Sequence, residues 1–199
     1  MRMNQPATKH SIVLFLLLIC FLGCKKNDSK TTTKPIDALV KTNLNVKDNI
    51  EQGLAKGNDG ATIANWFPET LLEYQLDPNK KDIGEGTQSR ASVVYVHPDN
   101  TSKNITIDVW DGNGPLALAV NNMIAVGLDG TGEEKNAQLR QKVYVRNDRK
   151  ASEQEIFQSS QVNISFEVDG RFYVTVRSGN NTLETLWEMT DLLDFNTLK

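Results

Sequence analysis

Oxygen-bearing side chains gather between Asp108 and Asn113, and their types suggest two kinds of chemistry. Asp108, Asp111 and Asn113 lie close to two glycines, and carboxylate and amide oxygens at such spacing can bind calcium. The EF-hand pattern, however, requires an oxygen ligand at loop position five and a glutamate at position twelve, where this chain has Pro115 and Asn122. Turn formation and helix capping are therefore the favoured interpretation, with a calcium site as the alternative.

His97 and two aromatic residues are the other candidates. An imidazole can act as a general base or a metal ligand, but no G-x-S-x-G motif accompanies His97, which precedes Pro98 at the end of a predicted strand. A structural role near a turn is the simpler interpretation. Trp110 shares one side of its predicted strand with Asp108, so we expect it on an open sheet face, beside Tyr95 or His97. An aromatic side chain there can serve as a binding platform.

The acidic, glycine-rich segment 129–134 does not match a phosphate-binding loop. The G-x-x-x-x-G-K-[ST] pattern needs a basic residue after its last glycine, and here two glutamates follow. We expect a solvated loop at this point and no cofactor in the protein.

The N-terminus has the three regions of a secretory signal. Arg2 and Lys9 give a basic start, and an apolar run of eleven residues, 12–22, follows. A membrane-spanning helix needs about 20 apolar residues, so the run fits a cleaved signal peptide better. The sequence Phe21-Leu22-Gly23-Cys24 resembles a lipobox, which implies cleavage after residue 23 and attachment of lipid to the Cys24 sulfur.

Cleavage at this point limits the chemistry of the mature chain. Cys20 leaves with the signal, and Cys24 carries lipid, so we expect neither a disulfide nor a cysteine nucleophile. Removal of residues 1–23 takes away two basic residues and no acidic one, which moves the formal net charge from −3 to −5. Nucleic-acid binding requires clustered Lys and Arg, so a nucleic-acid partner is not expected.

The remainder divides into a stalk and one domain. Residues 24–35 contain no apolar side chain after the cysteine, which favours a disordered stalk, and 36–199 suits a single domain. The spacing of Val46, Ile50 and Leu54, with Asn45 as a cap and Gly57 as a stop, predicts a helix within 36–55. Residues 58–87 predict only short helical turns or an irregular strand.

Hairpins and helices are clearer from residue 89 onward. Strands are predicted over 91–97, 105–110, 141–146, 153–157, 162–168 and 172–176, with a hairpin turn at Asp169-Gly170. Helices are predicted over 116–126 and after a capping box at Asn181 and Glu184. The order hairpin, turn, helix thus occurs twice, over 91–126 and 162–194. We expect an α+β fold, a two-layer antiparallel sheet with helices packed mainly on one face.

Several short motifs together resemble an uncharacterised family of small bacterial envelope lipoproteins. These are the lipobox, Pro68-x-x-Leu71-Leu72, the Tyr95 strand beside Ile105-x-Ile107-Asp108, and Gly170-Arg171-Phe172 before a closing helix. The resemblance covers most of residues 60–195. It implies the fold and the compartment, and no activity.

The sequence therefore predicts a lipid-anchored envelope protein that works as a non-enzymatic binding or accessory module. Its partners would be the membrane, through the anchor, and an envelope protein or a small ligand. The outer membrane facing the periplasm is the favoured location, with the cell surface as the alternative. A hydrolase of envelope polymers that uses two carboxylates such as Asp108 and Asp111 is the competing hypothesis.

Overall fold

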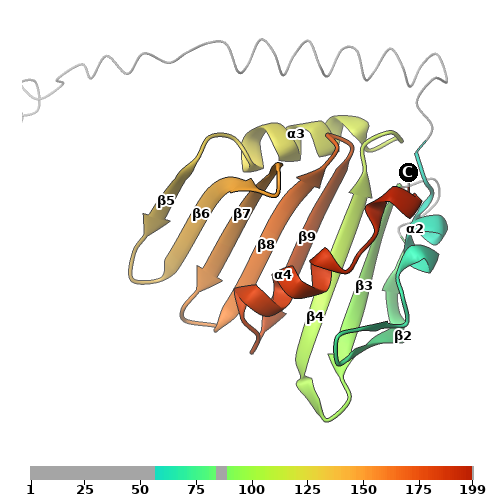
Figure 1. Ribbon diagram of the computed structural model, residues 1–199, viewed down its shortest axis with the longest axis horizontal. Helices are drawn as coiled ribbons and strands as arrows, with labels where there is room; N and C mark the ends of the chain where they lie inside the picture. The colour runs from blue at the N-terminus through green and yellow to red at the C-terminus, as the bar shows by residue number, and fades with distance from the viewer. Residues whose placement is uncertain (1–56, 84–88, 199) are drawn as a thin grey trace, which may run out of the picture. The chain divides into compact units, whose positions relative to one another are not determined.

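The computed structural model describes residues 57–83 and 89–198, which form an antiparallel sheet of nine strands with three α-helices (Figure 1). The expected α+β class is confirmed. In chain order the elements are α2 (Gly60–Trp66), β1 (Thr70–Leu71), β2 (Tyr74–Asp82), β3 (Arg90–His97), β4 (Asn100–Asp111), α3 (Ala117–Gly127), β5 (Gly132–Lys135), β6 (Leu139–Arg146), β7 (Arg149–Ile156), β8 (Gln161–Val168), β9 (Phe172–Gly179), α4 (Leu183–Asp191) and a 3-10 turn (Phe195–Leu198).

The sheet consists of two meanders, β1–β4 and β5–β9, that meet at its centre. The strand order is β1-β2-β3-β4-β9-β8-β7-β6-β5, so the last strand of the first meander pairs with the last strand of the second. β4 and β9 pair without interruption from Asn104 opposite Gly179 to Asp111 opposite Phe172. Because side chains alternate across each strand, this register places every second residue of both meanders on the same face.

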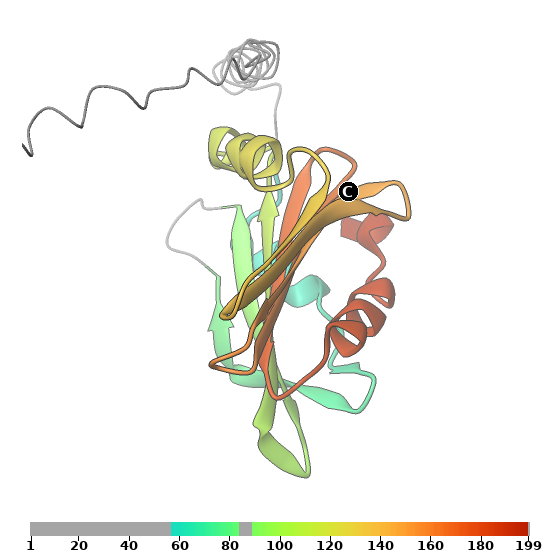
Figure 2. The same cartoon turned by 90° about the vertical axis from the view of Figure 1, so that its left-hand side faces the viewer.

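One face of the sheet, here called the covered face, carries the main core. It collects Val93, Ile107, Val176 and Ile164, which lie in one row across β3, β4, β9 and β8. Helices α2 and α4 contribute buried side chains to the same cluster, and both lie on this side of the sheet (Figure 2). Alternation of buried and half-buried residues along β3 and β8 follows directly from this arrangement.

Helix α3 packs differently. Its Val120, with Leu128 just beyond its end, packs against Tyr173 and Trp110, which point to the other face of the sheet, here called the open face. The helix lies across one end of the sheet rather than over its middle (Figure 2). The two predicted hairpin–helix units are therefore present as β3–β4–α3 and β8–β9–α4, but their helices pack against opposite faces.

Two tight turns fix the register of the second meander. At the predicted Asp169-Gly170 turn, both residues have positive φ (53° and 63°), and the Arg171 N–H donates to the Val168 carbonyl. Asn147 and Asp148 also have positive φ (51° and 62°) between β6 and β7. Turns of this hand match the twist of the strands that they join, and Asn, Asp and Gly tolerate the conformation.

The described part of 58–87 contains the short helix α2, the two-residue edge strand β1 and strand β2, whose register with β3 shifts between Leu76 and Lys81. The expected short helical turns and irregular strand are therefore present. Other boundaries differ from the expectation. The loop expected over 129–134 becomes strand β5 at Gly132, and the strand expected at 153–157 begins earlier, at Arg149. The helix predicted within 36–55, the signal peptide and the stalk lie outside the described residues. Among the described helices, none is long and apolar enough to cross a bilayer.

The N-terminal cap of α4 is Thr182, not the predicted Asn181. The Thr182 Oγ1 accepts from the Thr185 N–H, whereas the side-chain oxygen Oδ1 of Asn181 accepts from the Tyr74 hydroxyl in the core. Either residue type can cap a helix, and the tertiary contact with Tyr74 decides between them.

Replacement of this cap tests the assignment. Thr182→Ala should lower the free energy of unfolding by about 1 kcal/mol, because the Thr185 N–H loses its acceptor. Glu184→Ala, at the exposed position that the predicted capping box would use, should change it by less than about 0.5 kcal/mol. Urea denaturation followed by circular dichroism measures both, and a larger loss for Glu184→Ala than for Thr182→Ala would contradict the cap at Thr182.

Candidate functional site

The three predicted platform residues do not form one site. Tyr95 points into the covered face, where it is fully buried and its hydroxyl donates to the Pro68 carbonyl at 2.7 Å. Burial raises the pKa of this hydroxyl well above its ordinary value. Trp110 points to the open face, half-buried beneath α3, with the Arg90 guanidinium 5.3 Å from its ring centre. The expectation that Trp110 lies beside Tyr95 is therefore wrong.

His97 lies with the core aromatic residues rather than with Trp110. Its ring meets the Tyr74 ring edge-on, with 5.5 Å between the centres, and its Nδ1 accepts from the Asp99 N–H at 3.1 Å. This is the turn-proximal role that the sequence favoured. A binding role for Trp110 stays a prediction, now separate from Tyr95 and His97.

Asp111 is the most completely satisfied carboxylate in the region. It is fully buried, and it accepts from Arg171 Nε at 2.8 Å and from Arg171 Nη2 at 2.6 Å. The backbone N–H groups of Asn58 and Asn113 donate to the same carboxylate at 2.8 and 2.9 Å. These four bonds use both oxygens, so Asp111 holds the fold together and is not available to a metal or a substrate.

Asp108 points away from Asp111. Successive strand positions alternate between faces, so Asp108 lies on the open face and Asp111 on the covered side. Asp108 accepts from the Thr175 hydroxyl at 3.2 Å and lies 3.3 Å from the Arg177 guanidinium. The predicted calcium ligands Asp108, Asp111 and Asn113 thus do not converge. Within residues 57–83 and 89–198, no group of three acidic, His or Cys residues could hold a metal ion.

A row of amide side chains crosses the open face. Gln154 Nε2 donates to Gln141 Oε1 at 3.3 Å, and Asn163 Nδ2 donates to Gln154 Oε1 at 3.2 Å. Gln161 Nε2 donates to Asn163 Oδ1 at 3.1 Å, which extends the row along β8. Here these four residues are called the amide ladder. Each is only half-buried, so unused N–H groups and lone pairs remain toward solvent.

Hydroxyl groups line the adjacent row of the same face. Ser152, Ser165, Thr175 and Asp108 are cross-strand neighbours on β7, β8, β9 and β4. The amide row continues in register through Arg177 and Thr106, and Asp108 neutralises Arg177. Together the two rows form a polar surface of hydroxyls and amides with little net charge.

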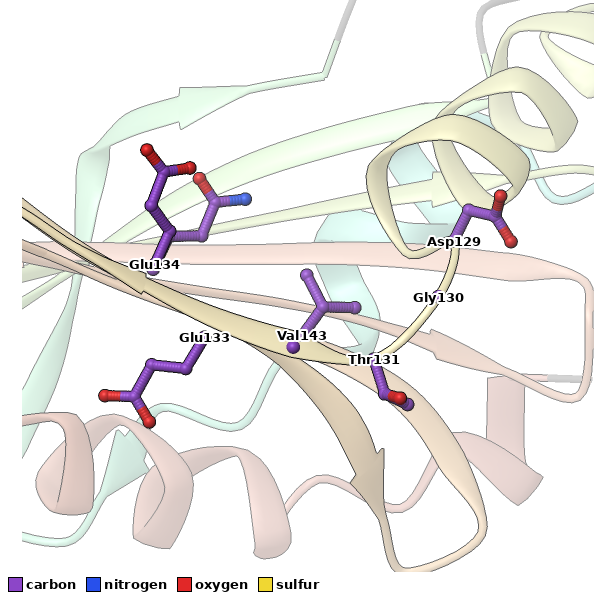
Figure 3. Close-up of a pocket in the computed structure, with 8 residues that line it drawn as sticks. Asp129, Gly130, Thr131, Glu133, Glu134 and Val143 are labelled. Carbon is purple, nitrogen blue, oxygen red and sulfur yellow. The ribbon is translucent and has the colours of Figure 1, made fainter. Parts of the chain in front are cut away.

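The amide ladder ends in a pocket at the edge of the sheet. The loop after α3 and strands β5 and β6 enclose a shallow, open hollow of about 350 Å³. Figure 3 shows that Glu134 and Val143 project from one side of β5 and β6, whereas Glu133 projects from the other. Gln141, the first residue of the ladder, belongs to the lining of this pocket. The open face therefore runs without a break from the pocket to β4.

Several charged side chains of β5, β6 and β7 lie on the covered side of the sheet rather than on the open face. Arg140 binds Glu133 at 2.8 Å and Glu155 at 3.0 Å on the covered side of β5–β7. The hydrogen bond from Arg140 and its positive charge lower the pKa of Glu133. Arg146 pairs with Asp191 of α4 at 2.9 Å. The four residues of the ladder are uncharged, and their row meets a charged residue at each end, Glu134 beside Gln141 and Arg177 beside Asn163.

Comparisons with known proteins give a distant likeness to solved structures. No protein-family model matches the chain, and no curated protein matches it. A GTP-binding regulator from Thermotoga maritima is similar in structure with 10% sequence identity and a TM-score of 0.32. The match covers 67% of this chain and 88% of that one.

Removal of the Asp111 carboxylate tests its structural role. Asp111→Ala should lower the free energy of unfolding by about 3 kcal/mol or more, because Arg171 is left inside the fold without its counter-ion. Asp108→Ala is the matched control and should cost about 1 kcal/mol or less, since its partner Arg177 is exposed. Chemical denaturation measures both, and equal losses would contradict the role given to Asp111.

Proposed function

We propose that this protein is a lipid-anchored envelope protein whose domain is a non-enzymatic binding module. The sequence supports the anchor, with residues 1–23 as signal peptide, Cys24 as the lipidated residue and 24–35 as a stalk. The domain supports the binding role through a broad polar face on which, among residues 57–83 and 89–198, only α3 packs, at one end, whereas α2 and α4 pack on the opposite face. The proposed location is the outer membrane, with the domain in the periplasm.

The ligand that this face fits best is uncharged and rich in hydroxyl groups, such as a glycan strand. The amide ladder carries this proposal, because carboxamides offer a donor and an acceptor side by side, as sugar hydroxyls require. The bonds within the ladder hold each amide in one orientation before a ligand arrives, which lowers the entropy cost of binding.

The composition of the face argues against the other ligand classes. A phosphorylated or nucleic-acid ligand would need several free cations, whereas Arg177 faces Asp108. The centre of a stable protein interface is enriched in aromatic, Met and Arg side chains, and the two central rows contain mainly Ser, Thr, Asn and Gln. A hydrolase based on Asp108 and Asp111 is not supported, because their side chains lie on opposite faces.

The size of the face suits an extended polymer. Gln141, Gln154 and Asn163 lie on successive strands, and Arg177 and Thr106 continue the row. Neighbouring strands are about 4.8 Å apart, so this row of five strands extends over roughly 19 Å. Its polar groups recur at a regular spacing, which matches a ligand built from repeated units rather than a compact one.

Substitution in the ladder tests the ligand class. Gln154→Ala removes the central amide and should weaken binding of the full chain to polysaccharides, including insoluble cell-wall glycan, by roughly fivefold to tenfold. Sedimentation with the insoluble glycan and titration with soluble polysaccharides measure the effect. Gln158→Ala is the control, because Gln158 is an exposed amide in the turn after β7 and lies outside the ladder. Unchanged binding by Gln154→Ala, or no binding to any glycan, would refute the proposal.

The anchor has its own test. Cys24→Ala removes the sulfur to which lipid would attach, so the protein should lack the mass of a lipid group and keep residues 1–23. Cys20→Ala should behave like the natural sequence, because Cys20 lies within the signal. Mass spectrometry of the membrane-derived protein should show a chain that begins at an acylated Cys24. A free Cys24 thiol in the natural protein would exclude the anchor.

A further inference from the structure

The hydrogen bonds across the amide ladder run in one direction. Asn163 donates to Gln154, and Gln154 donates to Gln141. Gln141 is the last acceptor of this series, and within the part of the chain that the structure describes its own Nε2 has no acceptor. A carboxamide nitrogen carries two N–H groups, so both are left for a ligand. The ladder therefore ends in a pair of donors at the β5–β6 pocket.

A carboxylate lies beside these donors. Glu134 of β5 pairs with Gln141 of β6, so their side chains are neighbours on the open face. Glu134 is exposed and has no ion-pair partner among the described residues. Glu133, by contrast, projects from the other side of β5 and binds Arg140 there (Figure 3). This end of the pocket thus offers two N–H donors and a carboxylate acceptor side by side.

The next pair of residues on the same face gives the pocket an apolar floor. Val143 pairs with Gly132, and the Val143 side chain lies on the same side of the strands as Glu134 (Figure 3). A Cβ placed on Gly132 would meet no atom within 4 Å beyond its chain neighbours, and the φ of Gly132 is not in the left-handed region. The backbone therefore does not require glycine here, and its missing side chain leaves the space above Val143 open.

A secondary amide that carries a methyl group matches all of these features. Its carbonyl accepts, its N–H donates, and the two point in opposite directions from one planar group, so it can bond to both Gln141 and Glu134. Its methyl group would then lie over Val143. A sugar hydroxyl can also bond to Gln141 and Glu134, but it would leave the valine methyl groups against water. An ammonium group can bind Glu134, but it offers no acceptor to the Gln141 N–H groups.

We propose that the β5–β6 pocket binds the N-acetyl group of an amino sugar within the glycan strand. The pocket volume of about 350 Å³ lies in the range of small-ligand sites, so it has room for one sugar unit with this substituent. The amide ladder then leads from the pocket across β7 and β8. This inference rests on the proposed glycan-binding function and specifies the ligand.

Three tetrasaccharides of the same linkage test the pocket. Those of β-1,4-linked N-acetylglucosamine, glucose and protonated glucosamine differ only in the acetamido, hydroxyl or ammonium group on each sugar. In calorimetric titration of the full chain, the N-acetylated tetrasaccharide should bind about tenfold more tightly than the glucose one, because only it covers Val143 with a methyl group.

The other outcomes separate this inference from the proposed function. Equal affinities for the three tetrasaccharides would overturn the N-acetyl pocket and leave glycan binding intact. Tightest binding of the glucosamine tetrasaccharide would overturn it in favour of an ammonium site at Glu134. No measurable binding of any tetrasaccharide would also overturn it, and sedimentation with cell-wall glycan would then decide the proposed function by itself.

Variants that fill the pocket locate the preference. Gly132→Leu should abolish the preference for the N-acetylated tetrasaccharide and keep binding of the glucose one, because the new side chain would lie over Val143. Lys135→Leu is the matched control, since it places the same side chain at an exposed position on the other face of β5, and it should keep the preference. Val143→Thr replaces one methyl group by a hydroxyl without added bulk and should weaken the preference. A preference unchanged in Gly132→Leu or Val143→Thr, or lost in Lys135→Leu, would overturn the proposal.

Discussion

The Asp111 carboxylate is buried where three distant parts of the chain meet. A buried charge is tolerated only with full pairing, and this one is paired by the Arg171 side chain and by the backbone of Asn58 and Asn113. The backbone carbonyl of Arg171 also accepts a hydrogen bond from the Gly112 N–H, next to Asp111. The Asn58 side chain in turn donates to the Leu198 carbonyl near the C-terminus. The Asp111 carboxylate thus joins Asn58, the end of β4 and the β8–β9 turn at one point, and Asn58 extends the network to Leu198.

This constraint lies at the junction of the two meanders, at the last pair of β4 and β9. Asp111 ends β4 opposite Phe172, and the alternation of side chains away from that point separates apolar from polar residues along the central strands. The apolar residues are buried beneath α2 and α4. The polar residues need no such cover, because amides and hydroxyls can form hydrogen bonds with one another and with water. An open face with an ordered polar surface is the consequence of this separation.

Local patterns predicted the elements well and their contacts poorly. Alternation identified both hairpins, and Asp169-Gly170 predicted its turn, because these features depend only on neighbouring residues. The Asp111–Arg171 pair joins residues 60 positions apart, and no local signal indicates it. Prediction of the amide ladder requires the register of β6, β7 and β8. The one indication in the sequence is a pair of amides at alternate positions, such as Gln161 and Asn163. The expected contact of Trp110 with Tyr95 fails because Trp110 pairs with Arg90 and Tyr95 with Ile105, which puts the two side chains on opposite faces, and the sequence does not reveal this register.

Helix α3 closes one end of the open face. Val120 and Leu128 are buried against Tyr173, and the partly buried side chains of Leu116, Met123, Ile124 and Trp110 pack around them. This apolar cluster sets the boundary of the polar surface, because beyond Trp110 and Tyr173 the adjacent rows of the open face carry amides and hydroxyls. An extended ligand would therefore lie on the part of the open face between this cluster and the β5–β6 pocket.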